Sequence, residues 1–267
     1  MIRTTRLLAT LAALSLTVAA CGGSDNTSEA ASSGDLTTVQ SGKLTVCTDA
    51  PYEPFEYQDE SGKWTGFDMD IMTKIAETND LELNVTVQTF DGILLKLAAK
   101  ECDVVASSVT ITEERKQSVD FSDGYFDSYQ SLLVRNEDAE TINSLEALDG
   151  KKVGVQASTT GEAFAKENAS GAKIQSYEDA SAMFLALDSK QIDAVLQDFP
   201  INASRAVKQG TTTVSAKFTE GQEAEQYGFA VEKGNTALLT VINKALTDFR
   251  ADGTYDTIFA KYFGASK

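Results

Sequence analysis

The stretch Asp103–Phe126 (DVVASSVTITEERKQSVDFSDGYF) decides how this chain is organised. It begins with a short apolar run that is rich in β-branched residues, which predicts a buried strand. Small hydroxyl residues follow this run: Ser107, Ser108 and Thr110. Arg115 comes seven residues after Ser108, and its planar guanidinium matches two carboxylate oxygens, while hydroxyls and backbone N–H groups can complete the cage. The pattern fits a carboxylate-binding site, and it fits an ordinary polar loop with a solvated arginine equally well.

The composition restricts the class of protein. The chain has 267 residues, enough for one large domain or two smaller ones, and carries a formal net charge of -17 with no histidine. Such acidity opposes binding to nucleic acid, whose phosphates would be repelled. The absence of histidine excludes a histidine-dependent hydrolase and a histidine-rich zinc site, so we expect neither a metal nor another cofactor.

The first forty residues predict export and anchoring. Residues 1–20 combine two arginines, a short apolar stretch and small residues at the end, which is typical of a signal peptide and too short for a comfortable membrane span. Cys21 follows directly and resembles the lipidated cysteine of a bacterial lipobox; the alternative is a plain secretory signal. Residues 21–40 are small and polar and predict a flexible tether. We therefore expect a protein that is lipid-anchored to the outer face of the bacterial cell membrane.

The sequence does not decide whether two further cysteines, Cys47 and Cys102, form a disulfide. An exported pair favours a bond. Against it, Cys47 lies late in one predicted strand and Cys102 lies just before another. If these two strands are parallel neighbours, the two cysteines would lie toward opposite ends of the strands. Their Cα separation would then exceed the usual range for a disulfide, which is about 4.4–6.8 Å.

Strands and helices alternate in the first half of the chain. Strands are predicted at residues 43–48, 83–89 and 104–106, and helices at 66–77 and 93–100. This order predicts a largely parallel sheet with helices on its faces, in which small ligands bind beyond the carboxyl ends of the strands. Asp49, Tyr52 and Phe90, together with the hydroxyl residues described above, fall at those ends.

A second unit repeats this arrangement. A strand at 152–156 leads into a hydroxyl-rich turn and a helix from about residue 162, so Thr159 and Thr160 fit either an anion site or an ordinary helix cap. The spacing around Asp193 echoes that around Asp103 and sets Asp198, an anion suited to an ammonium group, opposite Ser108.

Two crossings between the units are expected. Helices at 235–252 and 255–263 should pack back on the first unit, so the chain would cross near residues 125–130 and 222–227 and form a hinge. The expected bounds are 41–125 with 227–267 for the first lobe, and 126–226 for the second.

Six motifs then bring in a known family. They are Asp49–Glu56, Gly66-Phe-Asp-Met-Asp-Ile, Ser107–Arg115, Asp120–Tyr125, Asp193–Asp198 and Gly253–Ile258. With these motifs in the family's order, the chain resembles the family-3 extracellular solute-binding proteins, which serve bacterial ABC importers of polar amino acids. The resemblance implies a two-lobed α/β fold of the type II periplasmic-binding-protein kind, each lobe a mainly parallel sheet flanked by helices. It implies a monomer that closes on an L-amino acid and delivers it to an ABC permease.

The resemblance also assigns roles. Arg115 would clamp the ligand α-carboxylate, helped by Ser108 and Thr160. Asp198 would hold the α-ammonium group beside Thr110. Tyr52 and Phe90 would sandwich the ligand side chain, and Asp49 would meet its far end. The remaining members of the predicted ligand-binding set are Ser107, Gln156 and Thr159.

Ligand identity is less sharply indicated. An acidic Asp49 in an aromatic slot favours a basic amino acid. Glutamine stays open, because in glutamine-binding relatives an equivalent aspartate meets the amide. Those relatives carry a lysine where this chain has Gln156, and its absence leaves the pocket more negative.

Two other classes of protein, an enzyme and a sensor, fit the sequence less well. Some dehydratases of cyclic amino-acid precursors resemble this fold with one added catalytic carboxylate, for which Glu53, Glu113 and Glu223 are candidates. None of them lies in a motif beyond the binding pattern, so we expect no enzyme. A sensor would need a fused signalling domain, which we do not expect in a chain that ends shortly after its last predicted helix. The acidic residues Glu220, Glu223 and Glu225 are predicted to form a solvated face.

Overall fold

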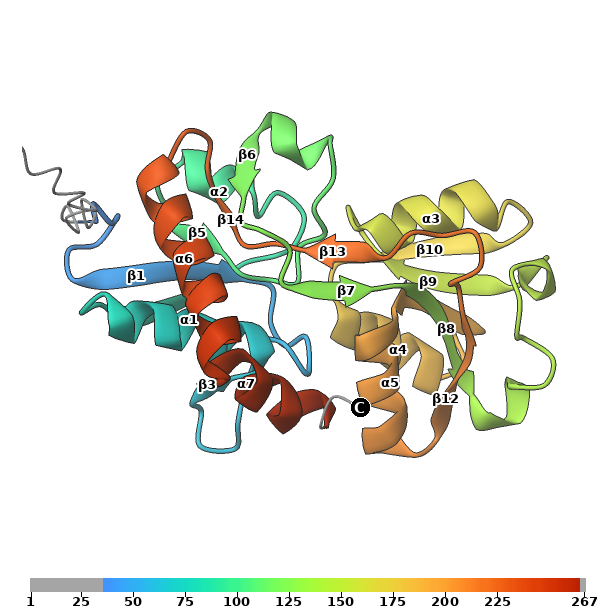
Figure 1. Cartoon of the computed structure of the whole chain (residues 1–267). Coiled ribbons are helices and arrows are strands. Elements are labelled where there is room, and N and C mark those ends of the chain that lie inside the picture. Colours follow the sequence, from blue (N-terminus) through green and yellow to red (C-terminus); the bar gives the residue numbers. More distant parts are fainter. Residues whose placement is uncertain (1–35, 265–267) are drawn as a thin grey trace, which may run out of the picture. The chain divides into compact units, whose positions relative to one another are not determined.

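The computed structural model describes residues 36–264. Within them the chain forms two five-stranded sheets, and a two-stranded ribbon runs between these sheets (Figure 1). The predicted signal peptide, the lipidation site Cys21 and residues 22–35 of the predicted tether lie outside the described residues. Among the described helices, none combines the length and the apolar character needed to cross a membrane.

The first sheet has the strand order β4-β1-β5-β14-β6. Its strands are β1 (Lys43–Thr48), β4 (Glu82–Val87), β5 (Val104–Val105), β6 (Val119–Phe121) and β14 (Ala230–Glu232). β1 pairs in parallel with β4 and β5, whereas β14 is antiparallel to both β5 and β6. Four strands therefore run in one direction and β14 runs in the other, which confirms a mainly parallel sheet.

The second sheet repeats this pattern in the order β10-β9-β11-β8-β12. Its strands are β8 (Gln130–Arg135), β9 (Lys152–Gln156), β10 (Lys173–Tyr177), β11 (Ala194–Asp198) and β12 (Thr212–Lys217). β9 is parallel to β10 and β11, and β8 is the strand that runs against its neighbours β11 and β12. Each sheet, together with the helices that cover it, forms one lobe.

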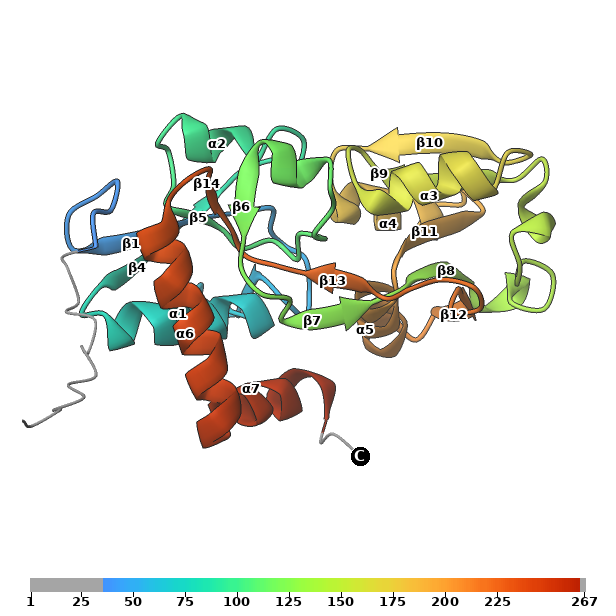
Figure 2. The same ribbon diagram turned by 45° about the horizontal axis from the view of Figure 1, so that its top comes forward.

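Helices cover both sheets. The first lobe carries α1 (Phe67–Thr78), α2 (Leu95–Ala98), α6 (Thr236–Asp252) and α7 (Thr254–Phe263), and the second carries α3 (Thr160–Asn168), α4 (Ala180–Asp188) and α5 (Phe199–Gln209). Short 3₁₀ helices span Arg115–Gln117, Asn136–Asp138 and Glu146–Leu148, and a small ribbon pairs β2 (Tyr57–Gln58) with β3 (Trp64–Thr65). Figure 2 shows α6 and α7 on the same lobe as α1, as the sequence predicts.

The helix predicted at 93–100 is shorter than expected. Only Leu95–Ala98 is α-helical, because the chain enters it through tight turns in which Ile93 N donates to Phe90 O and Leu95 N donates to Gly92 O. Gly92 has a φ of 78°, a value that favours glycine. The tight entry leaves Phe90 at the end of β4 rather than on a helix.

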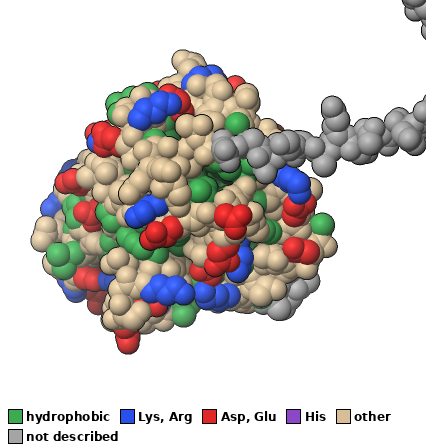
Figure 3. Space-filling model, turned by 90° about the vertical axis from the view of Figure 1, so that its left-hand side faces the viewer, with side chains coloured by type: hydrophobic (Ala, Val, Ile, Leu, Met, Phe, Trp, Pro, Cys, Tyr) green, Lys and Arg blue, Asp and Glu red, His purple; other side chains and the backbone are tan. Residues whose placement is uncertain are grey.

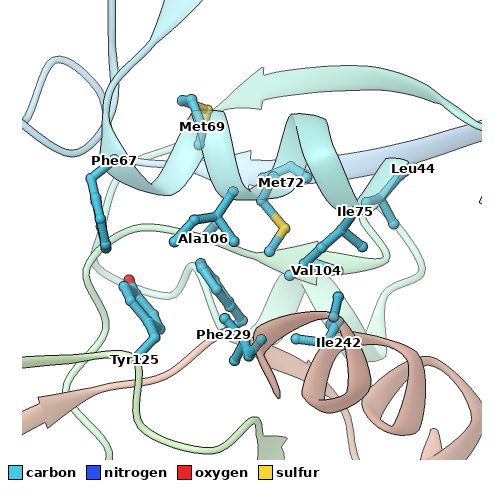
Figure 4. Close-up of a cluster of buried hydrophobic side chains, with 14 of the residues drawn as sticks. Leu44, Phe67, Met69, Met72, Ile75, Val104, Ala106, Tyr125, Phe229 and Ile242 are labelled. Atoms are coloured by element: carbon cyan, nitrogen blue, oxygen red, sulfur yellow. The ribbon is translucent and has the colours of Figure 1, made fainter. Parts of the chain in front are cut away.

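The core of the first lobe lies between α1, the sheet and α6 (Figure 4). Met72 and Ile75 of α1 face Val104 of β5. Ile242 of α6 packs into the same cluster, on the side of Val104 that lies away from α1. These side chains are essentially inaccessible to solvent. Burying a side chain of this size contributes about 1.5–3 kcal/mol, so the core holds the ends of β1 and β5 in fixed positions.

The hinge explains why one strand of each sheet is reversed. β7 (Phe126–Ser128) pairs antiparallel with β13 (Glu225–Tyr227), and the two strands link the lobes. β7 leads directly into β8, and β13 leads directly into β14. The reversed strand of each sheet is thus the one that follows a crossing, and the two expected hinge crossings are confirmed.

Cys47 and Cys102 form a disulfide with a Cα separation of 5.8 Å. The expected separation of the two cysteines was wrong, because Cys102 does not lie in line with the strand that follows it. β5 begins only at Val104, and the turn before it brings Cys102 over the face of the sheet that Cys47 faces. The turn is held by Asp103, whose carboxylate accepts hydrogen bonds from the N–H groups of Val39 and Thr45.

The surface at the first-lobe end carries charges of both signs. Figure 3 shows acidic and basic side chains interspersed there, with small apolar areas between them. Exposed ion pairs such as Lys74–Glu77 and Lys244–Asp248 are of the kind that contributes little to stability. The negative net charge is therefore not gathered on this face.

Candidate functional site

A pocket between the lobes is lined by residues from the carboxyl ends of strands in both sheets. Its lining consists of Asp49, Tyr52, Phe90, Ser107, Ser108, Thr110, Arg115, Gln156, Thr159, Thr160, Gly161, Gln197 and Asp198. The structure thus brings together all eleven residues of the predicted ligand-binding set, and it adds Gly161 and Gln197. They meet because β1, β4 and β5 end at one edge of the first sheet, and β9 and β11 end at the facing edge of the second.

Arg115 lies where the lobes meet. Its Nη1 donates to Thr110 O at 2.8 Å, and its Nη2 donates to Ser158 O of the second lobe at 3.1 Å. The guanidinium carbon lies 5.3 Å from the centre of the Phe90 ring, at a distance typical of a cation–π interaction. A guanidinium has five N–H donors, and these two bonds leave others for a carboxylate in the pocket.

Asp198 provides the opposite charge. It ends β11 and is almost fully buried, where its Oδ1 accepts a hydrogen bond from Gln130 Nε2 and its Oδ2 accepts one from the Tyr227 hydroxyl. Burial raises the pKa of Asp198 from 3.8 to about 7, and the nearby Glu225 carboxylate adds to the rise. The folded protein therefore disfavours the charged form of Asp198 as long as no cation is near. A cationic group placed beside Asp198 would favour the charged form again.

Asp49 forms another acidic end of the pocket. Its Oδ2 accepts a hydrogen bond of 2.5 Å from Nε2 of Gln156, a contact between the two lobes. Burial raises the pKa of Asp49 to about 6, against the effect of this hydrogen bond. Among the described residues, no lysine or arginine forms an ion pair with Asp49. This end of the pocket thus lacks a cation.

Beneath the pocket lie two fully buried carboxyl groups. Glu56 accepts hydrogen bonds of 3.3 Å from the hydroxyls of Ser107 and Ser108, while Asp68 accepts from the backbone N–H of Ser108 and from the Tyr125 hydroxyl. Burial raises the pKa of Glu56 well above its ordinary range and raises that of Asp68 to about 7. Ser108 has a φ of 47°, which is uncommon outside glycine, and these bonds hold it there.

The turn before α3 serves as a cap. Thr159 Oγ1 accepts a hydrogen bond from Glu162 N at 3.1 Å and donates to Gln156 O at 2.7 Å. The side chain of Thr159 is therefore the N-cap that the sequence left as one alternative. The N–H groups of the first turn of the helix, including those of Thr160 and Gly161, remain oriented as they would be for an anion.

Glu225 contradicts the sequence prediction. It was expected on a solvated face, but its carboxylate turns inward from β13 and accepts hydrogen bonds from the hydroxyls of Thr110 and Thr160. The reason is the pairing of β13 with β7, which puts Glu225 beside the pocket. Glu223, two residues earlier, is exposed as predicted.

Ser158 was also missed. Besides its carbonyl contact with Arg115, its hydroxyl donates to Asp91 Oδ1 of the first lobe at 2.8 Å. It has a φ of 63° and follows β9 by two residues. The hydroxyl-rich turn was visible in the sequence, but the direction of the Ser158 side chain depends on the positive φ at that residue.

The carboxylates nominated for catalysis lie elsewhere. Glu53 pairs with Lys208 of α5, Glu113 pairs with Lys116 on the surface, and Glu223 is exposed. None of the three lines the pocket. The pocket instead combines one arginine with two buried aspartates, Asp49 and Asp198, and neither forms an ion pair with a lysine or arginine within residues 36–264.

Two mainly parallel α/β lobes, joined by two crossings around a polar pocket, define a periplasmic-binding-protein-like fold of type II. The profile of the family described as "Bacterial extracellular solute-binding proteins, family 3" matches residues 44–265. The chain belongs to this family.

Individual relatives agree in length and fold. The L-cystine-binding protein TcyJ of Escherichia coli (strain K12) is 34% identical over 224 residues, which are 84% of each chain. A protein described as a probable histidine-binding protein of Neisseria gonorrhoeae is 33% identical over 263 residues, covering 96% of this chain and 94% of its own. Among solved structures, an ancestral arginine-binding protein bound to glutamine shares 40% identity and a TM-score of 0.79, covering 84% of this chain and 99% of that one.

Proposed function

We propose that this chain is the extracytoplasmic binding subunit of an ABC importer and that it captures one polar L-amino acid, preferably a basic one, between its lobes. The observation that carries the proposal is that Arg115 and the buried Asp198 face the same pocket. An amino acid is a zwitterion, and each of its charges needs a partner once water is excluded. The relatives named above bind cystine, histidine and arginine or glutamine according to their descriptions.

Within this proposal the roles follow from position. Arg115 holds the α-carboxylate together with N–H groups at the start of α3, and Asp198 holds the α-ammonium group. Tyr52 and Phe90 enclose the ligand side chain. Asp49 meets the end of that side chain. Because Asp49 forms no ion pair in the part of the chain that the structure describes, a guanidinium or ammonium group of the ligand would neutralise it.

Glutamine is the second candidate ligand. In the structure Asp49 accepts a hydrogen bond from the Gln156 amide, which is the bond that a glutamine side chain would offer. A neutral amide therefore satisfies Asp49 geometrically, although it leaves the negative charge of the pocket uncompensated.

We further propose that the protein acts by binding alone and reaches the membrane through a lipid on Cys21. None of the candidate catalytic carboxylates lines the pocket, and the curated relatives named above are described as binding proteins. Closure of the lobes on the ligand completes the charge pairs, and the closed form is the one that the permease would recognise.

Labelling with radioactive palmitate in the native host, with Cys21→Ala as control, tests the lipid anchor.

The binding proposal is tested by calorimetry on purified protein that has been freed of co-purified ligand. Arginine, lysine, ornithine, histidine, glutamine and cystine are titrated in turn. Tight binding of basic amino acids supports the proposal. Tight binding of glutamine alone would keep the proposed binding function and overturn the proposed preference for basic ligands. Binding of none of these amino acids would refute the proposal.

Two variants test the site itself. Arg115→Ala and Asp198→Ala should each abolish binding, because each leaves one charge of the buried zwitterion without a partner. Arg250→Ala is the matched control, since Arg250 is exposed on α6, where it donates to the Gly124 carbonyl and lies over the Tyr255 ring, and it does not line the pocket. Normal binding by either site variant would show that the assignment is wrong.

A further inference from the structure

Glu225 occupies a position from which one side chain reaches both lobes. It is the first residue of β13, where it pairs with Ser128 of β7 in the hinge. Its Oε2 accepts a hydrogen bond of 2.9 Å from the hydroxyl of Thr110, which follows β5 in the first lobe. The same oxygen accepts one of 2.6 Å from the hydroxyl of Thr160, at the start of α3 in the second lobe.

The second carboxylate oxygen of Glu225 extends this network. Oε1 accepts a hydrogen bond of 3.1 Å from Gln130 Nε2, and the same amide nitrogen donates to Asp198 Oδ1. Glu225 is therefore connected through one amide to the aspartate assigned to the ligand ammonium group. The two threonine hydroxyl oxygens lie 3.4 Å apart, so the contacts converge on a small volume at the lobe interface.

These bonds fix the orientation of the two hydroxyl groups. A threonine hydroxyl has one O–H donor and two lone pairs. When its hydrogen points to Glu225, only lone pairs remain for the pocket, and lone pairs accept hydrogen bonds from an ammonium group. Because the acceptor is a carboxylate, each of these bonds is also stronger than a bond between neutral groups.

The contacts of Glu225 also depend on closure of the two lobes. Thr110 and Thr160 belong to different lobes, whereas Glu225 belongs to the hinge strand between them. Separating the lobes would remove at least one of the two hydroxyls from the carboxylate. The Glu225 contacts are thus complete only when the lobes are together.

We propose that Glu225 is a positioning residue that couples closure of the lobes to retention of the ligand ammonium group, an inference that rests on the proposed amino-acid binding. Glu225 itself touches no ligand atom. It gathers hydroxyls from both lobes, turns their lone pairs toward the ammonium group and adds negative charge beside Asp198. Its carboxylate keeps the closed form from reopening.

The test compares Glu225→Gln with wild type in calorimetry and stopped-flow binding, using the amino acid that the wild type binds most tightly. Replacing the carboxylate by an amide should weaken affinity by about 10- to 100-fold, the usual effect of losing hydrogen bonds to a charged group. The loss should appear in the dissociation rate, with the association rate unchanged, because the contacts form after the ligand has entered an open cleft. Glu223→Gln is the matched control, since Glu223 is exposed two residues away.

A second variant keeps the result decisive if the hinge variant folds poorly. Thr160→Val removes one hydroxyl and leaves β13 unchanged. It should accelerate dissociation in the wild-type background and have a much smaller effect when combined with Glu225→Gln, because the two groups act through one bond.

The outcomes separate the two levels of the proposal. If the wild type binds no amino acid, the proposed function fails. If the wild type binds but Glu225→Gln binds equally well, or loses affinity only through slower association, the role of Glu225 is refuted. A lower melting temperature with unchanged dissociation would show a merely structural role and would also overturn it.

Discussion

Raising the pH should destabilise the ligand-free protein, and Asp198 allows the size of the effect to be worked out. Its pKa is about 7 in the folded protein against an ordinary value of 3.8. A carboxyl group whose pKa is raised by folding stabilises the folded state when it is protonated. This contribution is fully present below about pH 3.8 and is lost as the pH rises through about 7. Between pH 8 and pH 5.5, Asp198 alone should therefore change the free energy of unfolding by about 2 kcal/mol.

The perturbation is Asp198→Asn, which removes the titrating group. An amide keeps the shape of the side chain, its oxygen can accept from Gln130, and its NH₂ group can donate to the Tyr227 hydroxyl. Melting temperatures of the ligand-free wild type and variant are measured at both pH values. The wild type should gain about 4–8 °C more than the variant on acidification, as expected for a free-energy change of about 2 kcal/mol in a protein of this size.

Binding should show the opposite dependence on pH. A ligand ammonium group needs Asp198 in its charged form, so affinity should fall as the pH drops below about 7. The fall should approach tenfold for each pH unit if one proton must leave on binding. Parallel dependence of the melting temperature on pH in wild type and Asp198→Asn would contradict the raised pKa of Asp198, because it would mean that Asp198 titrates alike in the folded and unfolded chain.

Three further perturbations have defined outcomes. Replacing Cys47 and Cys102 by alanine opens a loop of 55 residues and should lower the free energy of unfolding in urea by about 4 kcal/mol; an unchanged midpoint would contradict this. Asp49→Asn should weaken calorimetric binding of arginine by about 10- to 100-fold and spare glutamine, and equal losses would refute the assigned contact. Gly66→Ala sets a Cβ 2.1 Å from a backbone oxygen and should cost more than about 3 kcal/mol by chemical unfolding, whereas Gly62→Ala, in open space, should cost far less.

Much of the fold was predictable because its signals are local. The apolar run of β1 and the periodic residues of α1 reveal their own structure, and their alternation along the chain implies a parallel sheet. Once the sheet is known, the residues that follow its strands must share an edge. For this reason Asp49, Phe90 and Ser108 could be predicted to lie together, and they do line one pocket.

The remaining features depend on contacts between distant parts of the chain. Glu225 carries no local signal, since its neighbour Glu223 is just as acidic and is exposed. Its inward direction results from the pairing of β13 with β7, about a hundred residues away in sequence. The Cys47–Cys102 bond was similarly undecidable, because it depends on where β5 begins within an apolar run.

The exchange of strands at the hinge imposes an order on assembly. All five strands of the second sheet come from one continuous stretch, residues 130–217, so this half can become complete while later residues are still being made or threaded across the membrane. The first sheet, although it begins the chain, lacks β14 until residue 230 has arrived. Because β14 lies between β5 and β6, that sheet has a gap in its middle until then. We therefore expect the portion made first to finish folding last, and to be the portion that needs protection from aggregation during export.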